Sequence, residues 1–295
     1  MIERTYFQPA NLKHAQSLLA ENQGARIVAG GTDLVVAARS GKAQLPASLI
    51  AIHGLTELTR IEATAGGGLK IGALATHGDL EASDLAIRSW TALPDASALV
   101  GSPATRHLGT VGGNVCNASP AMELGSPLLI FDASVELASA RGKRRVPFGS
   151  FVAGPGRTTV QPDELLTAVE LPPLQVRGRV GSAYVRLEYR AAMEIAVVGA
   201  AALVAVDDSN RCAEARVALT AVAPTCVRAT RTEEILRGKH LDARLLEQAA
   251  EAAAQSAKPI DDVRGSADYR RAMVPVIVLR ALNKALDRAA QVGPR

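Results

Sequence analysis

Cysteines, aromatic residues and long apolar runs are all scarce in this chain, and each scarcity excludes a class of protein. The three cysteines, Cys116, Cys212 and Cys226, are far apart and show no C-x-x-C spacing. They form neither a disulfide framework nor, alone, a four-thiolate iron–sulfur site. Aromatic residues make up 3% and are not interleaved with basic residues, as a base-stacking surface for nucleic acid requires. No run reaches about 20 apolar residues and no secretory signal opens the chain, so we expect a cytoplasmic protein without a membrane span.

Several motifs of cofactor and metal chemistry are missing as well. Neither G-x-G-x-x-G nor G-x-x-x-x-G-K-[ST] occurs, which argues against a Rossmann enzyme and a P-loop NTPase. There is no G-x-S-x-G, and no cluster of His, Cys, Asp or Glu has metal-ligand spacing. One basic cluster, RGKRR at residues 141–145, lies between two apolar runs, and a hairpin turn explains it better than nucleic-acid binding.

The composition is that of a folded protein with one or two cores, since 48% of the 295 residues are hydrophobic and 21% are charged. Residues 11–24 have helical spacing with Asn11 as candidate cap. A short strand, a helix capped by Thr32 or Asp33, and a further strand complete a small α/β unit. Residues 58–75 alternate around three glycines and predict a hairpin, Thr76 starts a helix, and residues 85–100 are expected to be helical.

Pro172 and Pro173, followed by QVRGRVG, mark the best boundary in the chain. Beyond them three strand-like runs with intervening turn signals predict an antiparallel sheet, and three helices follow. The fold class is therefore α+β.

Two short apolar runs break into paired glycines, at residues 27–34 (IVAGGTDL) and 110–114 (TVGGN). Glycine has no Cβ, so successive backbone N–H groups can converge on one point and hold a phosphate. Two such nests would grip a diphosphate from two sides. Each segment also reads as a tight turn leaving a strand. Nearby, Cys116 reads as a small packed residue, and His77 and His107 as capping or loop residues.

Together these segments resemble the FAD-binding, or medium, subunit of the molybdenum hydroxylases, the family of xanthine dehydrogenase and carbon monoxide dehydrogenase. AGGTDL is similar to that family's first pyrophosphate segment, and RHLGTVGGNVCNASPAMELGSPLLIFDA to its second. VPFGSFVAGPGRTTVQPDELLTAVELP resembles the segment that closes the FAD domain, and AVAPTCVRATRTEEILRG with PIDDVRGSADYRRAMVPVIVLRAL resembles the C-terminal domain.

The resemblance runs almost end to end and implies a domain organisation. Residues 1–175 would form a two-part α/β FAD-binding domain of the PCMH, or vanillyl-alcohol-oxidase-like, kind, with subdomains of about 1–57 and 58–175. Residues 176–295 would form an antiparallel sheet with helices, like the CO dehydrogenase flavoprotein C-terminal domain.

The resemblance also implies which residues bind FAD. Val100, Leu166 and Arg186 match positions that line the flavin and adenine ends of the site in relatives, some of which carry Lys in place of Arg186. Glu123 stands where relatives usually carry an Asp that hydrogen-bonds sugar or ribityl hydroxyls, and Ile195 where some place an aromatic ring over the flavin. From the residues alone, Val100, Leu166 and Ile195 also read as core, and Glu123 as a charge in a first helical turn. The expected cofactor-binding residues are Ile27, Val28, Ala29, Gly30, Gly31, Thr32, Asp33, Leu34, Val100, Thr110, Val111, Gly112, Gly113, Asn114, Glu123, Leu166 and Arg186, with no catalytic side chain and no metal ligand.

The implied function is electron transfer by non-covalently bound FAD within a multi-subunit enzyme. A large molybdopterin subunit would oxidise the substrate, and a small subunit with two [2Fe–2S] clusters would pass electrons to this FAD, in a dimer of heterotrimers. The final acceptor stays open among NAD, oxygen, a quinone and a carrier protein. The alternatives are a flavin-free scaffold or assembly protein of the same fold, the flavin subunit of a hydroxybenzoyl-CoA reductase-like enzyme, and a stand-alone flavin oxidase. The reductase subunit carries an extra [4Fe–4S] cluster, which three dispersed cysteines do not favour.

Overall fold

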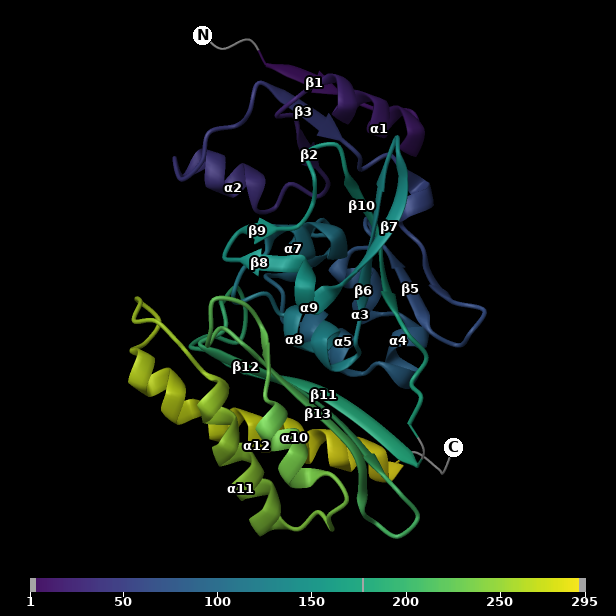
Figure 1. Ribbon diagram of the computed structural model, residues 1–295. Helices are drawn as coiled ribbons and strands as arrows, with labels where there is room; N and C mark the ends of the chain where they lie inside the picture. The colour runs from purple at the N-terminus through teal and green to yellow at the C-terminus, as the bar shows by residue number, and fades with distance from the viewer. Residues whose placement is uncertain (1–3, 177, 292–295) are drawn as a thin grey trace.

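The computed structural model describes residues 4–176 and 178–291 and arranges them around three main sheets (Figure 1). The strands are β1 (Thr5–Phe7), β2 (Arg26–Val28), β3 (Ser48–Ala51), β4 (Ile61–Ala63), β5 (Leu69–Gly72), β6 (Ser134–Ser139), β7 (Gly142–Pro147), β8 (Val152–Gly154), β9 (Arg157–Thr158), β10 (Leu165–Leu171), β11 (Arg179–Leu187), β12 (Val198–Val206), β13 (Cys212–Thr220) and β14 (Val227–Arg228). The α-helices are α1 (Leu12–Glu21), α2 (Leu34–Arg39), α3 (His77–Glu81), α4 (Asp84–Ser89), α5 (Ala92–Ser97), α6 (Pro103–Arg106), α7 (Val111–Asn117), α8 (Gly125–Ile130), α9 (Phe148–Phe151), α10 (Thr230–Leu236), α11 (Ala243–Ala253) and α12 (Ala267–Gln291). Two 3-10 helices, η1 (Thr56–Leu58) and η2 (Ala254–Ser256), complete the set.

The N-terminal sheet is small and parallel, in the order β1-β3-β2, with α1 packed beside it (Figure 1). The predicted cap of α1 is confirmed, because the Asn11 side chain accepts a hydrogen bond from the backbone N–H of His14 at 2.9 Å. The parallel arrangement aligns the carboxyl ends of the strands, and the loop after β2 leaves the sheet at that edge.

The second sheet is antiparallel, in the order β4-β5-β10-β6-β7. The predicted hairpin around the three glycines is confirmed as β4 and β5. The basic cluster occupies the β6–β7 hairpin, with its last four residues, which include three basic ones, on the edge strand β7. Each of these side chains has an acidic partner: Lys143 pairs with Glu136, Arg144 with Glu164 and Arg145 with Glu170. The cluster therefore serves the sheet and presents no free cationic surface.

The helix expected over residues 85–100 is two helices, α4 and α5, separated at Trp90 and Thr91. Pro94 explains the break, because its ring would clash with the carbonyl four residues earlier in a continuous helix. In the first turn of a new helix a proline is tolerated, since its missing N–H needs no intrahelical partner there. By contrast, the expected start of α3 is confirmed: Thr76 and Asp79 form a capping box.

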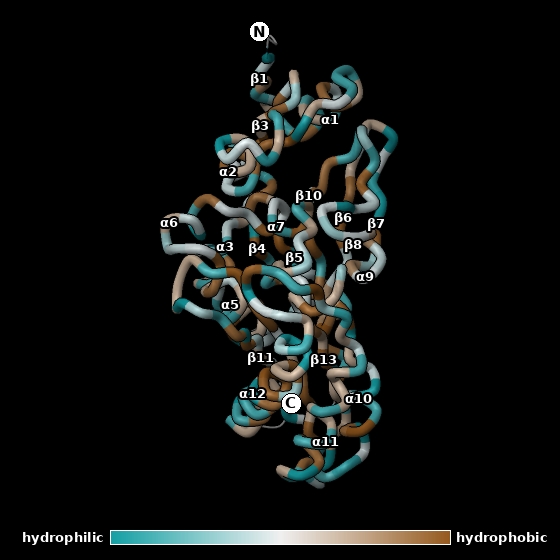
Figure 2. The backbone as a smooth tube through the Cα atoms, turned by 90° about the vertical axis from the view of Figure 1, so that its left-hand side faces the viewer, coloured by the Kyte–Doolittle hydropathy of each residue, from teal (hydrophilic) through white to brown (hydrophobic). Residues whose placement is uncertain are grey.

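The C-terminal sheet has the order β11-β12-β13-β14 and is antiparallel throughout, as predicted. Its first three strands were expected, and the short strand β14 is additional. Every residue of β12 is buried, because the sheet is covered by α12 on one face and by α8 of the preceding part on the other. The three predicted helices are confirmed as α10, α11 and α12. Figure 2 shows hydrophobic stretches along β13 and α12, in keeping with this core.

Two aspartates tie the C-terminal sheet to the rest of the molecule. Asp95 on α5 accepts hydrogen bonds from Arg288 Nη1 at 2.7 Å and Lys284 Nζ at 3.0 Å on α12, and from the backbone N–H of Tyr184 on β11 at 3.0 Å. Asp132 accepts from Arg216 Nη1 on β13 at 2.5 Å. Charge-assisted bonds of this kind are directional, so they fix β11 relative to the helices before it.

The loop after β2 lies directly against the segment that joins α6 to α7. A Cβ on Gly30 would stand 1.7 Å from the carbonyl oxygen of Leu108, so only glycine permits this approach of two backbones. The second backbone is itself anchored, because the N–H of His77 at the start of α3 donates to the Gly109 carbonyl at 3.0 Å. The two glycine segments are thereby brought to opposite sides of one space.

We expect Gly30→Ala to lower the free energy of unfolding by about 3 kcal/mol, because the added methyl group overlaps main-chain atoms rather than the end of a flexible side chain. Urea denaturation of the full chain measures this. Gly54→Ala is the matched control, since a Cβ there meets nothing within 4 Å. Equal stability of the two variants would show that the loops do not pack as described.

Candidate functional site

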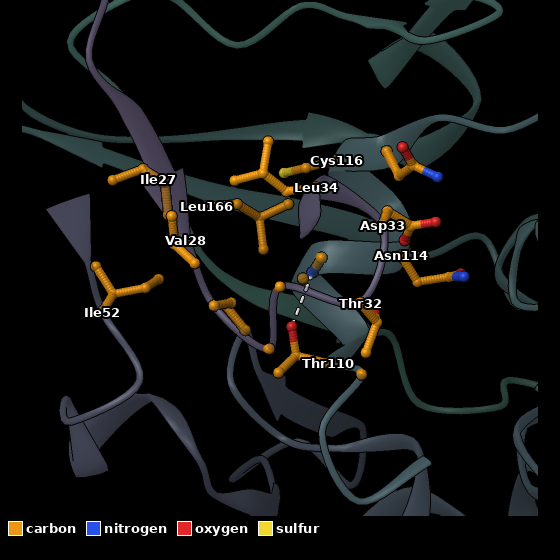
Figure 3. Close-up of a pocket in the computed structure, with 18 of the residues that line it drawn as sticks. Ile27, Val28, Thr32, Asp33, Leu34, Ile52, Thr110, Asn114, Cys116 and Leu166 are labelled. Carbon is orange, nitrogen blue, oxygen red and sulfur yellow. Dashed lines mark hydrogen bonds between the residues drawn. The ribbon is translucent and has the colours of Figure 1, made fainter. Parts of the chain in front are cut away.

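A cavity of about 300 Å³ lies between the loop after β2, the start of α7 and the start of β10 (Figure 3). Ile27, Val28, Leu34, Ile52 and Leu166 form an apolar side. The polar groups of Thr32, Asp33 and Asn114 gather at the other side in Figure 3. Of the expected cofactor-binding residues, the cavity brings together Ile27, Val28, Ala29, Gly30, Gly31, Thr32, Asp33, Leu34, Val100, Thr110, Gly112, Gly113, Asn114 and Leu166.

The first glycine segment forms a nest of free donors. Gly31 has a φ of +71°, a conformation that favours glycine, and it turns the chain from β2 into α2. The backbone N–H groups of Gly30, Gly31, Thr32 and Asp33 find no acceptor within the described residues. Asp33 stands at the N-cap of α2, but neither it nor Thr32 makes the expected side-chain cap bond. These four N–H groups are thus available to an anion.

The second glycine segment differs from the expected second nest, because it is the first turn of α7. Its N–H groups already have acceptors: Val111 donates to Ala75 O at 2.8 Å and Gly112 to Ala73 O at 2.9 Å. The N–H of Gly113 donates to Oγ1 of the N-cap residue Thr110 at 3.0 Å, the dashed line in Figure 3. A Cβ on Gly112 would meet the Ala73 carbonyl oxygen at 2.7 Å, so this glycine serves close packing.

What the second segment offers the cavity is side-chain polarity. Oδ1 of Asn114 is buried and has no hydrogen-bond partner within the described residues. A buried orphan acceptor is costly and marks a place where a polar group of a ligand or a water is needed. Asn114 therefore lies beside Thr32 and Asp33 of the first segment with one polar atom unsatisfied.

Three expected residues lie outside the cavity lining. Val111 is fully buried in α7. Glu123 and Arg186 are buried against each other, with Oε1 of Glu123 2.6 Å from Nη1 of Arg186. Burial raises the pKa of Glu123 to about 7, although the charge of Arg186 opposes the shift. Their role toward a cofactor stays a prediction. Ile195, expected near the flavin, is exposed on the segment after β11.

Eleven residues of the cavity lining were missed or given another role by sequence reasoning, and four of them are titratable. Cys116, read as packed, faces the cavity, and the protein around its thiol raises its pKa to about 12, so it is neutral. His77 starts α3, as expected, but also lines the cavity; burial and then the charge of Arg106 lower its pKa to about 4. Arg26 and Glu164 line it too, one position before the expected segment 27–34 and two positions before the expected residue Leu166. Their proximity to expected residues was the available signal.

The charge of the cavity is set by few groups. Arg26 is the one cation at neutral pH among the lining residues, since His77 is neutral. Glu164 is held by Arg144, whose Nε and Nη2 lie 2.6 and 2.7 Å from its two oxygens. This pairing keeps the pKa of Glu164 below its usual value. Within residues 4–176 and 178–291 no group of three or more metal-ligating side chains exists, and no helix is long and apolar enough to cross a membrane.

Comparisons with known proteins cover nearly the whole chain. Residues 2–174 match the family model of the FAD binding domain in molybdopterin dehydrogenase, and residues 183–285 that of the CO dehydrogenase flavoprotein C-terminal domain. The xanthine dehydrogenase FAD-binding subunit of Escherichia coli O157:H7 is 33% identical over 285 residues, 97% of each chain. The carbon monoxide dehydrogenase medium chain of Hydrogenophaga pseudoflava is 32% identical over 286 residues, 97% of this chain and 98% of that one.

Solved structures agree with the sequence relatives. Carbon monoxide dehydrogenase from Hydrogenophaga pseudoflava, in a form that lacks the Mo-pyranopterin moiety, matches with a TM-score of 0.90 at 30% identity, over 97% of this chain and 98% of that chain. Quinoline 2-oxidoreductase from Pseudomonas putida 86 matches with a TM-score of 0.89 at 30% identity, over the same shares. The fold and site thus define an FAD-binding subunit of an oxidoreductase complex. More narrowly, the chain belongs to the FAD-binding, or medium, subunits of the molybdenum hydroxylase family, as the resemblance implied.

The cavity fits this cofactor. The free N–H groups of residues 30–33 suit an anionic diphosphate, and the orphan Oδ1 of Asn114 suits a hydroxyl or amine donor. The apolar side offers a surface for a planar ring. A Cβ on Gly31 would contact only side-chain atoms of Val35 and Val28, so the nest has room for a ligand on its open side.

We expect Gly31→Ala to weaken FAD binding by about tenfold or more, because an alanine at this φ is strained by about 1 kcal/mol and the loop relaxes by turning its N–H groups away. Fluorescence titration of the FAD-free chain measures the affinity. Gly41→Ala is the matched control: its φ is +72° at the other end of α2, and a Cβ there meets nothing within 4 Å. If both variants bound FAD like the parent chain, the nest would have no part in the site.

Proposed function

We propose that this chain is the FAD-carrying electron-transfer subunit of a multi-subunit molybdenum hydroxylase, which takes electrons from the [2Fe–2S] clusters of a partner and passes them to an external acceptor. The observation that carries the proposal is the cavity lined by the four residues with free backbone N–H groups and by Thr110 and Asn114. FAD supplies the redox chemistry, since it accepts electrons singly and releases them as a pair.

The work of the chain itself is to bind and orient. The N–H groups of residues 30–33 would hold the diphosphate, and Val100 and Leu166 would contact its two ends. Glu123 and Arg186 complete the proposed site on the side of the C-terminal sheet. Because His77 is neutral and Cys116 carries its proton, neither adds charge beside the diphosphate.

Partner subunits belong to the proposal because the chain lacks ligands for iron–sulfur clusters. Its three cysteines are dispersed, and Cys212 is buried. A small subunit would carry the [2Fe–2S] clusters and a large subunit the molybdopterin, in a dimer of heterotrimers. The names of the relatives support this, since they are subunits of xanthine and carbon monoxide dehydrogenases.

We further propose that the chain divides into residues 1–175 and 176–295, which the two matched family models support. We also propose a cytoplasmic location.

The proposal is tested by purifying the chain from its native host with whatever accompanies it and recording the visible spectrum before and after denaturation. We expect flavin bands from FAD that is released without a covalent bond, together with iron–sulfur absorbance from companion chains. The external acceptor is identified by mixing the complex, reduced under anaerobic conditions, with NAD, a quinone or oxygenated buffer in separate experiments. A colourless chain that also fails to take up added FAD would contradict the proposal and favour a scaffold. A [4Fe–4S] signal from this chain would favour the reductase-like alternative.

A further inference from the structure

Outside the cavity lining, the most unusual polar cluster is built around the guanidinium of Arg186. Its side chain is 1% exposed and sits on β11, where Nη1 meets Glu123 at 2.6 Å and Nε meets Glu188. Its third nitrogen, Nη2, has no hydrogen-bond partner within the described residues. Two carboxylates therefore share one guanidinium, at the contact between the segment before α8 and the C-terminal sheet.

The charge of this cluster does not balance. With both carboxyl groups ionised its net charge is −1, and no other cation faces Glu123 within the part of the chain that the structure describes. The remaining titratable neighbours, Tyr184 on β11 and Cys226 before β14, are held neutral, because burial raises the pKa of each. A buried net charge is costly, and two carboxyl groups close to each other share a proton readily.

We propose that Glu123, Arg186 and Glu188 form a proton-binding site, which holds one proton on the Glu123 carboxyl and exchanges it as the bound FAD takes up electrons. Only the exchange of this proton with the flavin rests on the proposed function. Reduction of FAD to FADH2 takes two electrons and two protons, and iron–sulfur clusters of a partner deliver electrons without protons. When FAD is bound, the Glu123 carboxyl would supply one of these protons and water the other, and water on the side of Glu188, which is half-buried, would restore the proton of Glu123.

Independent features favour Glu123 over other carboxyl groups as the proton holder. The pKa of Glu123 is raised, whereas the pKa values of the buried acids Glu136 and Glu164 are lowered by their basic partners and hydrogen bonds. Glu123 is also close to the cavity along the chain, because it lies between α8 and α7, whose residues Asn114, Cys116 and Asn117 line the cavity.

Infrared titration of the full chain without FAD, from about pH 5 to 9, tests whether Glu123 holds a proton. We expect a protonated-carboxyl C=O band that disappears with a midpoint near neutral pH and is absent in Glu123→Gln. Glu188→Gln should lower the midpoint, because Glu123 then has Arg186 to itself. Glu123→Asp, which keeps a carboxyl group, should keep a titrating band, and Glu136→Gln, another buried acid, should leave it unchanged. A band that persists in Glu123→Gln, or none that titrates in this range, would overturn the proton site.

The midpoint potential of FAD in the assembled complex, measured against pH, tests the proton exchange with the flavin. The slope of the parent complex should change near the infrared midpoint, and the Glu123→Gln complex should show no such change. An identical pH dependence in both complexes would refute proton exchange with the flavin. Failure of the parent chain to bind FAD would refute the proposed function and leave the infrared result standing.

Discussion

The close approach of Gly30 to the Leu108 carbonyl is the contact on which the rest of the site depends. It joins the carboxyl end of β2 to the segment that leads into α7, and a single methyl group would prevent it. Because Gly109 is bonded to the start of α3, the second sheet and its helices are drawn to the N-terminal sheet at the same point. The cavity is the space that remains between two backbones held in this way.

The two glycine segments look alike in sequence but act differently. In the first, the glycines leave N–H groups free and allow a φ that other residues avoid. In the second, the N–H groups donate to the carbonyls of Ala73 and Ala75, which follow β5, and to the Thr110 cap, and Gly112 gives α7 its close contact with Ala73. The free donors thus all belong to the first segment, and the second contributes the side chain of Asn114. Asp95 and Asp132 then set where the C-terminal sheet, with Arg186, meets this arrangement.

Much of the fold could be predicted from local signals in the sequence. The Asn11 cap, the Thr76 capping box and the glycine hairpin are decided within a few residues, and all three were predictable. The break before α5 depends on Pro94 and was overlooked, and β1 was missed because a three-residue strand has too little pattern to register. The first segment and its partners Val100 and Leu166 could be placed by resemblance. The engaged N–H groups of α7 and the sharing of Arg186 between Glu123 and Glu188 depend on contacts between distant segments, which spacing does not encode.

The four free N–H groups of the first segment are proposed to hold a dinucleotide by its diphosphate. Calorimetric titration of the FAD-free chain with FAD, FMN and ADP distinguishes this mode of binding, because FMN lacks both the diphosphate bridge and the adenine. We expect FAD to bind at least about tenfold more tightly than FMN, a difference of about 1.4 kcal/mol or more, and ADP to compete with FAD. FMN binding as tightly as FAD, or ADP binding without displacing FAD, would show that the cavity does not hold the diphosphate.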